Sequence, residues 1–472
     1  MTDGKKQEKG FEKETRYSTT MTATTTTPAS ASACPPTDFG GPIGCLCTMI
    51  VLPILVLVLS HWANMGYLDL NWSSIVFSDA ESGTLRMFGT DPMVVLHCFL
   101  GLVAWFSSLV VLWYIVPGPW VEGAPVIDPE VDYTSTKNAP PKQKLQYKLN
   151  GHTTFWIVIL TVLTTQIPLN DYLYQYYDQL AGMDIVLCFG LSTYLYVTSF
   201  RSNTNRRTKK ILSHTGRSGN RMYDYFMGRE LNPRAFQTTF DWKQFCELRP
   251  GLFLWVLLNY ACLQEQWKRS GTISGSMVLI NLFHFIYVWD SVYNEKSILT
   301  TMDITTDGFG FMLIFGDLTW VPFTYNHPTK YLVQHDPHLS GCALAGIVVL
   351  YSVGYTIFRL ANRQKDLFRQ NPMDVRVQHL TYLQTHRGTR LLTSGWWGTA
   401  RKINYTGDYL MGLSYSLLCG TSSIVPYYYS IYFLILLIHR SIRDDELCYE
   451  KYGPDWIEYK RLVPYRFLPG II

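Results

Sequence analysis

The sequence predicts an all-α polytopic membrane protein with about ten transmembrane helices, and three observations lead to that fold class. Hydrophobic residues make up 47% of the 472 residues and charged residues only 16%, whereas soluble domains carry about 25% charged residues. The apolar residues gather in runs close to the about 20 residues that a helix needs to cross a bilayer. Lys and Arg are concentrated in alternate connections between these runs, as in cytoplasmic loops.

The first part of the chain, residues 1–41, is predicted to be a disordered cytosolic tail. It is polar and contains a Thr/Ser/Pro/Ala tract with too little apolar surface to fold. It does not have the layout of a signal peptide, because the first apolar run starts after residue 42 and is too long. The membrane domain is therefore expected to occupy residues 42–472.

Seven apolar runs are clear candidates for membrane spans, and three further runs are weaker because they hold Gly, Pro or polar residues. A total of nine or eleven spans also remains open. The seven clear runs are 43–62, 93–116, 153–169, 180–200, 250–267, 274–293 and 339–361, and the three weaker runs are 308–325, 405–419 and 423–439.

The basic residues indicate which connections face the cytosol. With ten spans and a cytosolic N-terminus, the cytosolic side receives the basic segments 137–148, 201–210, 363–369 and 440–453. The opposite connections, 63–92, 170–179 and 420–422, hold almost no Lys or Arg; Arg86 is the main exception, and Lys268 and Arg269 mildly break the pattern. Both termini are therefore predicted to be cytosolic.

Charge and cysteine usage exclude some classes of function. The formal net charge of +4 is too small to indicate a nucleic-acid partner. The ten cysteines lie mostly inside apolar runs, and no CxxC pair has a partner at zinc-like spacing. We interpret them as small buried apolar residues and expect no metal site.

Ionisable residues inside predicted spans mark a first candidate site. In "HFIYVWDSVYNE" (284–295), Tyr287, Asp290 and Asn294 share one helix face, and Asp303 and Asp307 follow shortly after. Acids and tyrosines with few compensating cations suggest a proton-donating site in an apolar cavity, because burial favours a protonated carboxyl. Alternatively, Asp303 or Asp307 caps the N-terminus of the next helix.

Two further acidic residues belong to the same region. Asp317 lies in the next predicted span, and Glu295 closes the quoted segment. Both are costly inside a bilayer, so both are kept as members of the candidate site.

The stretch "LLTSGWWGTARKINYTGDYL" (391–410) marks a second candidate site. Together with the tail 440–466 it flanks the last two short spans with basic and aromatic residues. One interpretation is a belt of snorkelling side chains that contact anionic lipids. The other is a pocket for a polyanionic cytosolic ligand, which the hydrogen-bonding residues Asn404 and Tyr405 and the acids Asp444 and Asp445 favour.

Several long motifs resemble one known family. They include "LNGH" (149–152), "GRELNPR" (228–234), "FCELRPG" (245–251), "LTTMDITTDGFGFML" (299–313), "GDLTWVPF" (316–323), "FRLANRQKDLFR" (358–369) and the ending "DDELCYEKYGPDWIEYKRLVPYRFLPGII" (444–472). Over residues 43–472 the chain resembles the sterol reductases that act on Δ14, Δ7 or Δ24(28) bonds, a group that includes the membrane domain of the lamin B receptor. The second and fourth of these motifs are most similar to the Δ14 branch.

The resemblance implies an NADPH-dependent enzyme of the endoplasmic reticulum membrane that takes a sterol from the bilayer and reduces its C14=C15 bond by protonation followed by hydride transfer. It places the first spans in residues 42–270 and the sterol and NADPH-binding half, with its cofactor pocket, in residues 271–472. The cofactor residues that it implies are Lys365, Arg369, Leu392, Trp397, Asn404, Tyr405, Asp444, Cys448, Glu450, Lys451, Tyr452 and Tyr459.

Some details depend on this resemblance. Tyr287 and Asp444 are the expected members of the proton-delivery path, with Asp290, Glu295, Asp303 and Asp307 in reserve. Trp397 or Tyr405 is expected to stack on a ring of the cofactor, and Gly395 and Gly398 to let the backbone pass close to it. The chain departs from the family at Lys402, where a His is usual, and the sequence offers no explanation for this lysine.

Other functions stay open at this point. Related enzymes reduce a Δ7 or a Δ24(28) bond, so reduction of either bond is one alternative. A sterol-binding scaffold without chemistry and a membrane methyltransferase, whose final helical pair is similar, are alternatives from other classes.

Overall fold

The computed structural model describes residues 38–79, 84–85, 89, 91–126, 143–201, 210–235 and 239–471. The predicted tail 1–41 lies almost entirely outside the described residues, as do half of the basic segment 137–148 and most of the basic segment 201–210. Residues Thr37–Ile472 form one compact unit, and the expected division of the membrane domain near residue 270 stays a prediction.

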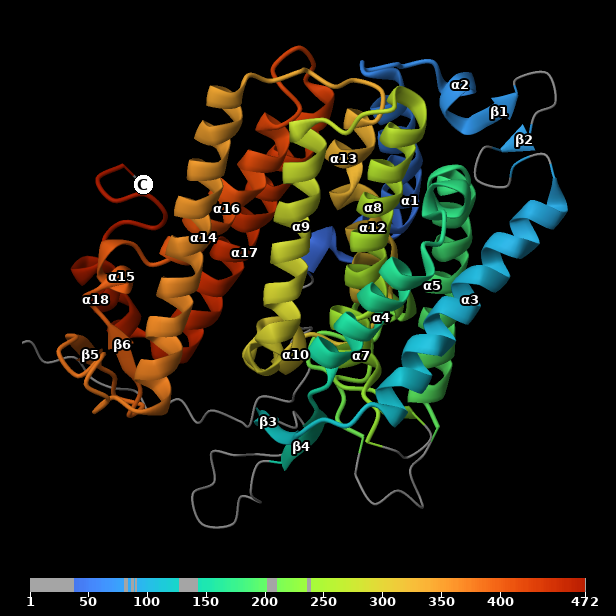
Figure 1. Ribbon diagram of the computed structural model, residues 1–472. Helices are drawn as coiled ribbons and strands as arrows, with labels where there is room; N and C mark the ends of the chain where they lie inside the picture. The colour runs from blue at the N-terminus through green and yellow to red at the C-terminus, as the bar shows by residue number, and fades with distance from the viewer. Residues whose placement is uncertain are drawn as a thin grey trace, which may run out of the picture. The chain divides into compact units, whose positions relative to one another are not determined.

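Helices dominate this unit, as Figure 1 shows. The middle and right of the view hold the helices of the first part of the chain. Their bounds are α1 Gly41–Met65, α2 Trp72–Val76, α3 Pro92–Ile115, α4 Gly151–Thr165, the π-helix η2 Asn170–Tyr174, α5 Tyr177–Ser199, α6 Arg221–Met227, α7 Trp242–Leu248, α8 Pro250–Ser270 and α9 Gly275–Tyr293.

The second part of the chain begins with short helices and ends with the long helices at the left of Figure 1. They are α10 Met302–Thr305, α11 Phe311–Phe315, the π-helix η5 Gly316–Trp320, α12 Val321–Tyr325, α13 His327–Leu332, α14 Gly341–Gln370, α15 Trp396–Thr399, α16 Ile403–Leu417, α17 Tyr428–Tyr452 and α18 Pro454–Leu462.

The described strands form three antiparallel pairs at the ends of helices. They are β1 Phe77–Asp79 with β2 Thr84–Leu85, β3 Trp120–Val126 with β4 Gln143–Lys148, and β5 Tyr382–Gln384 with β6 Arg390–Leu392. In the last pair Leu383 lies opposite Leu391.

Five described helical segments are long and apolar enough to cross a membrane: Asp38–Met65, Pro92–Ile115, Tyr177–Ser199, Gly275–Tyr293 and Gly341–Gln370. Helices also form at the other five predicted positions. α4 and α16 are shorter, with 15 residues each, and run 308–325 is divided among α11, η5 and α12. The structure therefore supports a multi-pass helical membrane protein with five clear candidate spans.

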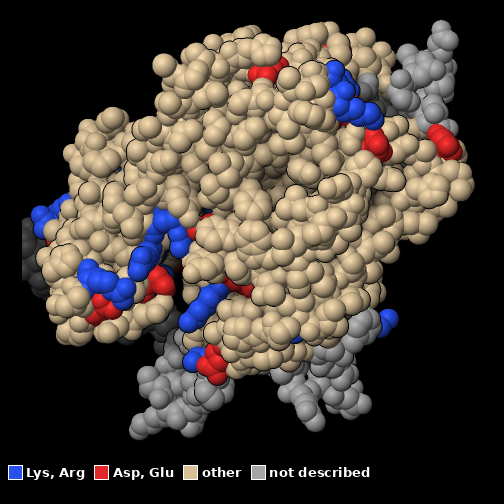
Figure 2. All heavy atoms as spheres, in the orientation of Figure 1, with Lys and Arg blue, Asp and Glu red and all other residues tan. Residues whose placement is uncertain are grey.

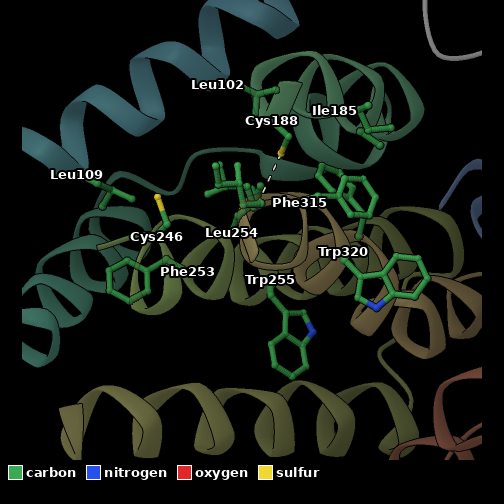
Figure 3. Close-up of a cluster of buried hydrophobic side chains, with 14 of the residues drawn as sticks. Leu102, Leu109, Ile185, Cys188, Cys246, Phe253, Leu254, Trp255, Phe315 and Trp320 are labelled. Carbon is green, nitrogen blue, oxygen red and sulfur yellow. Dashed lines mark hydrogen bonds between the residues drawn. The ribbon is translucent and has the colours of Figure 1, made fainter. Parts of the chain in front are cut away.

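The main hydrophobic core is built around α8. Figure 3 shows Phe253, Leu254 and Trp255 of α8 among side chains from α3, α5, α7 and the α11–η5 segment. Cys188 of α5 is fully buried and donates a weak hydrogen bond to the Ile314 carbonyl, 3.7 Å from its sulfur. α8 is surrounded on all sides because its apolar residues are not confined to one stripe.

The described cysteines partly fit the predicted role of buried apolar residues. Six are buried: Cys45, Cys98, Cys188, Cys246, Cys262 and Cys419. Cys448 is half-buried, whereas Cys47 and Cys342 are exposed.

α14 and α16 cross at a pair of glycines. A Cβ atom on Gly354 of α14 would lie 2.7 Å from the Gly407 carbonyl oxygen, and one on Gly407 of α16 would lie 2.6 Å from the Gly354 carbonyl oxygen. Neither position has space for a methyl group, so the two backbones approach closely in the manner of small-residue helix contacts in membranes.

Candidate functional site

The lower ends of α14, α16 and α17, with α15 and α18, carry the residues that the sequence assigned to a cofactor (Figure 1). α14 presents Lys365 and Arg369 one turn apart. The remaining residues come from β6 (Leu392), α15 (Trp397), α16 (Asn404 and Tyr405), α17 (Asp444, Cys448, Glu450, Lys451 and Tyr452) and α18 (Tyr459).

Trp397 supports Lys365. The Lys365 ammonium lies 3.9 Å from the centre of the Trp397 ring, and the Trp397 indole N–H donates to the Ala361 carbonyl at 2.7 Å. Trp397 is only 6% exposed and packs with Leu392 and Phe368. A cation over an indole face is held by the ring quadrupole, so Trp397 positions the lysine, and that contact already covers part of the ring predicted to stack on a cofactor.

The two glycines beside Trp397 serve the protein's own packing. A Cβ on Gly395, whose φ is +65°, would lie 2.5 Å from the Gln364 side chain, and a Cβ on Gly398 would lie 2.5 Å from the Thr393 carbonyl oxygen. Gln364 in turn accepts the Trp396 backbone N–H at 2.9 Å. The positive φ at Gly395 and the close backbone contact at Gly398 therefore favour glycine at both positions.

Lys402, unexplained by the sequence, has a clear partner. Its ammonium forms an ion pair with the Asp444 carboxylate and lies 5.6 Å from the centre of the Tyr405 ring. Cys448, one turn along α17, makes a weak contact of 3.9 Å with the same carboxylate. Lys402 therefore fixes Asp444 beside the N-terminus of α16.

The final residues of the chain lie along this segment. The backbone N–H groups of Arg401 and Lys402 donate to the carbonyls of Tyr465 and Arg466 at 2.9 and 2.8 Å. The Thr406 hydroxyl donates to the Phe467 carbonyl at 2.8 Å. We call Val463–Phe467 the C-terminal strap, because it holds the start of α16 in place.

Asn404 presents an unused hydrogen-bonding atom. Its amide N–H contacts the Asn362 side-chain oxygen at 3.4 Å, while its own side-chain oxygen is buried and has no hydrogen-bond partner among the described residues. A buried acceptor without a partner costs about 1–3 kcal/mol. A ligand donor would remove that cost.

Other predicted residues lie at the edge of this group. Tyr452 and Tyr459 pack with Trp456 and Cys448 in a small cluster, and burial raises the pKa of Tyr459 to about 12. Glu450 and Lys451 are exposed at the end of α17, where the Lys451 ammonium lies 5.0 Å from the Tyr452 ring centre. These two residues are the least integrated members of the predicted set.

The acids of the "TTMDITTDGFG" segment are paired with arginines of α17. Arg440 donates to Asp303 at 2.6 Å, and Arg443 donates to both carboxylate oxygens of Asp307 at 2.6 and 3.0 Å. Asp307 is fully buried. The expectation that these acids have few compensating cations is therefore wrong, because α17 supplies a cation to each of them.

The alternative role of these acids as helix caps is also wrong. The residue that caps α10 is Thr301, whose hydroxyl accepts the Ile304 N–H at 3.5 Å. The residue at the cap position of α11 is Gly310. Asp303 lies in the first turn of α10, and its side chain turns to Arg440.

Lys243 joins the same segment from the other side. Its ammonium is fully buried and lies 2.5 Å from the Asp303 carbonyl and 2.6 Å from the Asp307 carbonyl. Burial lowers the pKa of Lys243. α10 is thus fixed between α7 and α17 by contacts that no sequence pattern revealed, because Lys243 lies within an otherwise ordinary short helix.

Asp290 also has a cation. The Tyr355 hydroxyl of α14 donates to it at 3.0 Å, and the Arg359 guanidinium lies 3.3 Å away. Arg359 also donates to Asn294 at 2.8 Å. The shared face of Asp290 and Asn294 predicted from their spacing is confirmed by a 3.3 Å contact between their side chains, and this face binds α14.

Glu295 belongs to a buried structural network. It accepts from Arg249 at 2.7 Å, from Gln244 at 2.7 Å and from the Gly151 backbone N–H at 2.8 Å. Arg249 also donates to Asn150 at 2.8 Å. The motifs "LNGH" and "FCELRPG" are therefore tied together around one carboxylate, which gives Asn150, Gly151 and Arg249 a structural role.

Tyr287 is half-buried on α9 and packs against Trp255, with ring centres 5.9 Å apart. Asp408 of α16, which the sequence analysis passed over, lies within electrostatic range of the Tyr287 hydroxyl, and one of its carboxylate oxygens is buried without a hydrogen-bond partner among the described residues. The signal was available, because an acid within a predicted span is a functional candidate by default.

A hollow separates the lower parts of the C-terminal helices from the end of α9. Figure 2 shows basic and acidic side chains gathered along it. Ion pairs join α17 to Asp303 and Asp307, and α14 to α9.

Comparison with known proteins identifies the family. The family model described as "Ergosterol biosynthesis ERG4/ERG24 family" matches residues 35–472. The chain belongs to this family.

Relatives within the family are similar over nearly their whole length. The Delta(14)-sterol reductase of Ascobolus immersus is 40% identical over 443 residues, which cover 92% of this chain and 98% of the relative. The Delta(14)-sterol reductase TM7SF2 of Mus musculus is 40% identical, with 92% and 98% covered. The Delta(14)-sterol reductase ERG24 of Saccharomyces cerevisiae is 39% identical, with 92% and 97% covered.

Proposed function

We propose that this protein is a Δ14-sterol reductase that uses NADPH to reduce the C14=C15 bond of a sterol intermediate. The observation that carries the proposal is the set of ERG4/ERG24-family relatives named Delta(14)-sterol reductase at about 40% identity over nearly the whole chain. We further propose that it crosses the endoplasmic reticulum membrane about ten times with both termini in the cytosol, because helices form at all ten predicted positions.

The residues of the C-terminal site fit a phosphorylated nicotinamide cofactor. Lys365 and Arg369 form no ion pair with an acid in the described part of the chain, so both side chains are available to phosphate oxygens. The buried side-chain oxygen of Asn404 lacks a donor and suits an amide or hydroxyl group. When bound, NADPH supplies a hydride to the substrate.

The chain's own residues would bind and orient this cofactor. Lys365, fixed over Trp397, and Arg369 hold the phosphates. Asp444, fixed by Lys402, accepts a hydrogen bond from an amide or ribose hydroxyl. Tyr405 and Tyr452 line the same end of the helices and limit the access of water.

An isolated double bond is a poor hydride acceptor, so it must be protonated before a hydride can add to it. A proton added at carbon 15 leaves a tertiary cation at carbon 14, which an adjacent 8,9 double bond delocalises. Tyr287 is our candidate donor, since it lies among aromatic rings that can stabilise a cation through their faces. Asp408, which lies within electrostatic range of Tyr287, is our candidate for returning a proton to it.

The remaining acids are ranked lower as donors. Asp290, Asp303 and Asp307 are each paired with an arginine, and an ion-paired carboxylate has no proton to give. Asp444 is similarly paired with Lys402, so we assign it to orientation of the cofactor and to a later position in the proton path.

The test is reduction of a conjugated 8,14-diene sterol by the purified full-length protein with NADPH. We expect the ultraviolet absorbance of the diene to fall and a product two mass units heavier to form. Reduction of a Δ7 or Δ24(28) substrate in place of the diene would identify the protein as the corresponding other reductase of the family. Binding of NADPH and sterol with no product would show a scaffold, and binding of S-adenosylmethionine in place of NADPH would show a methyltransferase.

A further inference from the structure

A second polar pocket lies at the opposite ends of the helices from the cofactor candidates. It has a volume of about 350 Å³ and is formed where the end of α1, η2, the start of α5, the end of α8 and α13 meet. Its lining residues are Asn64, Asn170, Asp171, Tyr174, Gln175, Tyr177, Asp178, Glu265, Lys268, Arg269, Lys330 and Gln334. None of them belongs to the C-terminal site.

The inner wall of the pocket holds a buried charged group. Lys330 is 3% exposed, and its ammonium lies 2.5 Å from the Ser60 hydroxyl, 3.7 Å from Asp178 and 3.7 Å from the centre of the Tyr177 ring. Ser60 also donates to Asp178. Such a group is costly in a membrane domain and marks a functional site by default.

The outer wall carries two more ion pairs. Lys268 contacts Asp171 at 2.7 Å, and Arg269 contacts Glu265 at 2.6 Å. The Arg269 guanidinium also lies 5.6 Å from the centre of the Tyr174 ring. Figure 2 shows basic and acidic side chains side by side at the upper right, over this end of α8.

The charges of the pocket are balanced. Three acids and three bases line it, so it offers both signs of charge at short range and no net field. A polyanion would meet three carboxylates, and a simple cation would meet three bases. A zwitterion, with one group of each sign, matches this arrangement.

The pocket lies beside an exposed apolar and aromatic surface. Trp267 next to Lys268 is 57% exposed, Tyr172 of η2 is 59% exposed, and Met65 and Tyr67 at the end of α1 are 38% and 56% exposed. Trp and Tyr are enriched at the level of lipid headgroups. The end of the apolar α1 segment, Asp38–Met65, defines the same level.

We propose that this pocket binds the headgroup of a zwitterionic phospholipid. The phosphate lies beside Lys268 and Arg269, and the ammonium lies beside Asp171 and Glu265. The acyl chains extend over the exposed apolar surface formed by Trp267 and its neighbours. The lipid links α1, η2, α8 and α13 and stabilises the end of the membrane domain opposite the cofactor site.

The test compares lipids and variants by native mass spectrometry and thermal unfolding of the full-length protein purified in detergent. Glu265→Gln with Arg269→Gln removes one outer ion pair, and Glu122→Gln with Lys144→Gln is the matched control, because that exposed pair lies on the β3–β4 hairpin away from the pocket. Synthetic phosphatidylcholine and phosphatidylglycerol with the same acyl chains are the probes.

We expect one phosphatidylcholine to stay bound to the wild type and the control, and the outer-pair variant to bind it about tenfold more weakly, which corresponds to about 1.4 kcal/mol. Phosphatidylcholine should raise the unfolding temperature of the wild type more than that of the outer-pair variant. Equal retention by both variants, or equal stabilisation by phosphatidylglycerol, would overturn the proposal, since neither result requires a pocket that recognises both charges.

Discussion

At the scale of single residues, the structure separates basic side chains that lack an acidic partner among the described residues from acids that are paired within the protein. Lys365 is supported by a ring contact and has no acidic partner among the described residues, whereas Asp303 and Asp307 are used up in ion pairs. Residue type and spacing do not distinguish these cases, because the partners of Asp303 and Asp307 lie more than 130 residues away on α17. Only the fold reveals them.

Lys365→Ala with Arg369→Ala is expected to raise the KM for NADPH at least tenfold and to leave sterol binding unchanged. Each lost hydrogen bond to a charged group is worth about 1.5–3 kcal/mol. Steady-state kinetics with varied NADPH measure the effect. Arg363→Ala, an exposed basic residue of the same helix, is the control and should behave as wild type; an unchanged KM in the double variant would exclude the phosphate role.

Tyr287→Phe is expected to lower turnover by about 10²-fold or more and to keep NADPH binding, because it removes only the hydroxyl proton. Single-turnover loss of the diene and separate titration of NADPH measure the two effects. Tyr293→Phe, on the same helix and 62% exposed, is the control. Full activity of Tyr287→Phe would remove this residue from the proton path, and Asp408→Asn would then become the next variant to test.

At the scale of elements, short segments join the long helices. α10 has only four residues. Lys243 of α7 nevertheless binds the Asp303 and Ile304 carbonyls of α10 and the Asp307 carbonyl just after it. Arginines of α17 bind the carboxylates of Asp303 and Asp307. The long apolar runs were predictable because span length and composition dominate their formation. The division of run 308–325 into α11, η5 and α12 could not be predicted from the sequence. A π-turn depends on tertiary packing, and no particular amino-acid composition marks it.

Arg443→Met is expected to destabilise the protein by about 3–5 kcal/mol, because it leaves the fully buried Asp307 carboxylate without its cation. Arg443→Met combined with Asp307→Leu should recover part of that loss, since both charges are then absent. Thermal unfolding in detergent compares the variants. Arg461→Gln with Glu458→Gln, an exposed pair on α18, should change stability by less than about 1 kcal/mol.

α18 should detach from the β5–β6 pair at low pH. Asp455 accepts the His386 backbone N–H at 2.8 Å and contacts the His386 ring at 2.6 Å, and these hydrogen bonds lower the pKa of Asp455. Its stabilising effect is therefore complete above the ordinary carboxyl pKa of about 3.9 and is lost as the pH falls through the lower value of the folded state. Unfolding temperatures between pH 6 and pH 3 should fall less for Asp455→Asn than for wild type; parallel curves would contradict this assignment.

At the scale of the whole molecule, membrane class, helix positions and family were all accessible from the sequence, and the family is confirmed. The members of the predicted cofactor site were named through motifs, but the contacts that hold each of them in place could not be predicted. The ion-pair partner of Lys402 is Asp444, 42 residues further on. The close contacts of Gly395 and Gly398 are with Gln364 and Thr393. The second pocket gave no motif at all, because its charges come from four separate elements.

The C-terminal strap has a consequence for genetics. The carbonyls of Tyr465, Arg466 and Phe467 hold the backbone of Arg401 and Lys402 and the side chain of Thr406, so the last residues belong to the same structural unit as the start of α16. A stop codon or frameshift between positions 453 and 463 spares every long helix, because α17 ends at Tyr452, and still releases the segment that carries Lys402 and Asn404. Alleles truncated so late in the reading frame should therefore accumulate as inactive protein, whereas alleles that end after residue 467 should complement a strain that lacks the enzyme.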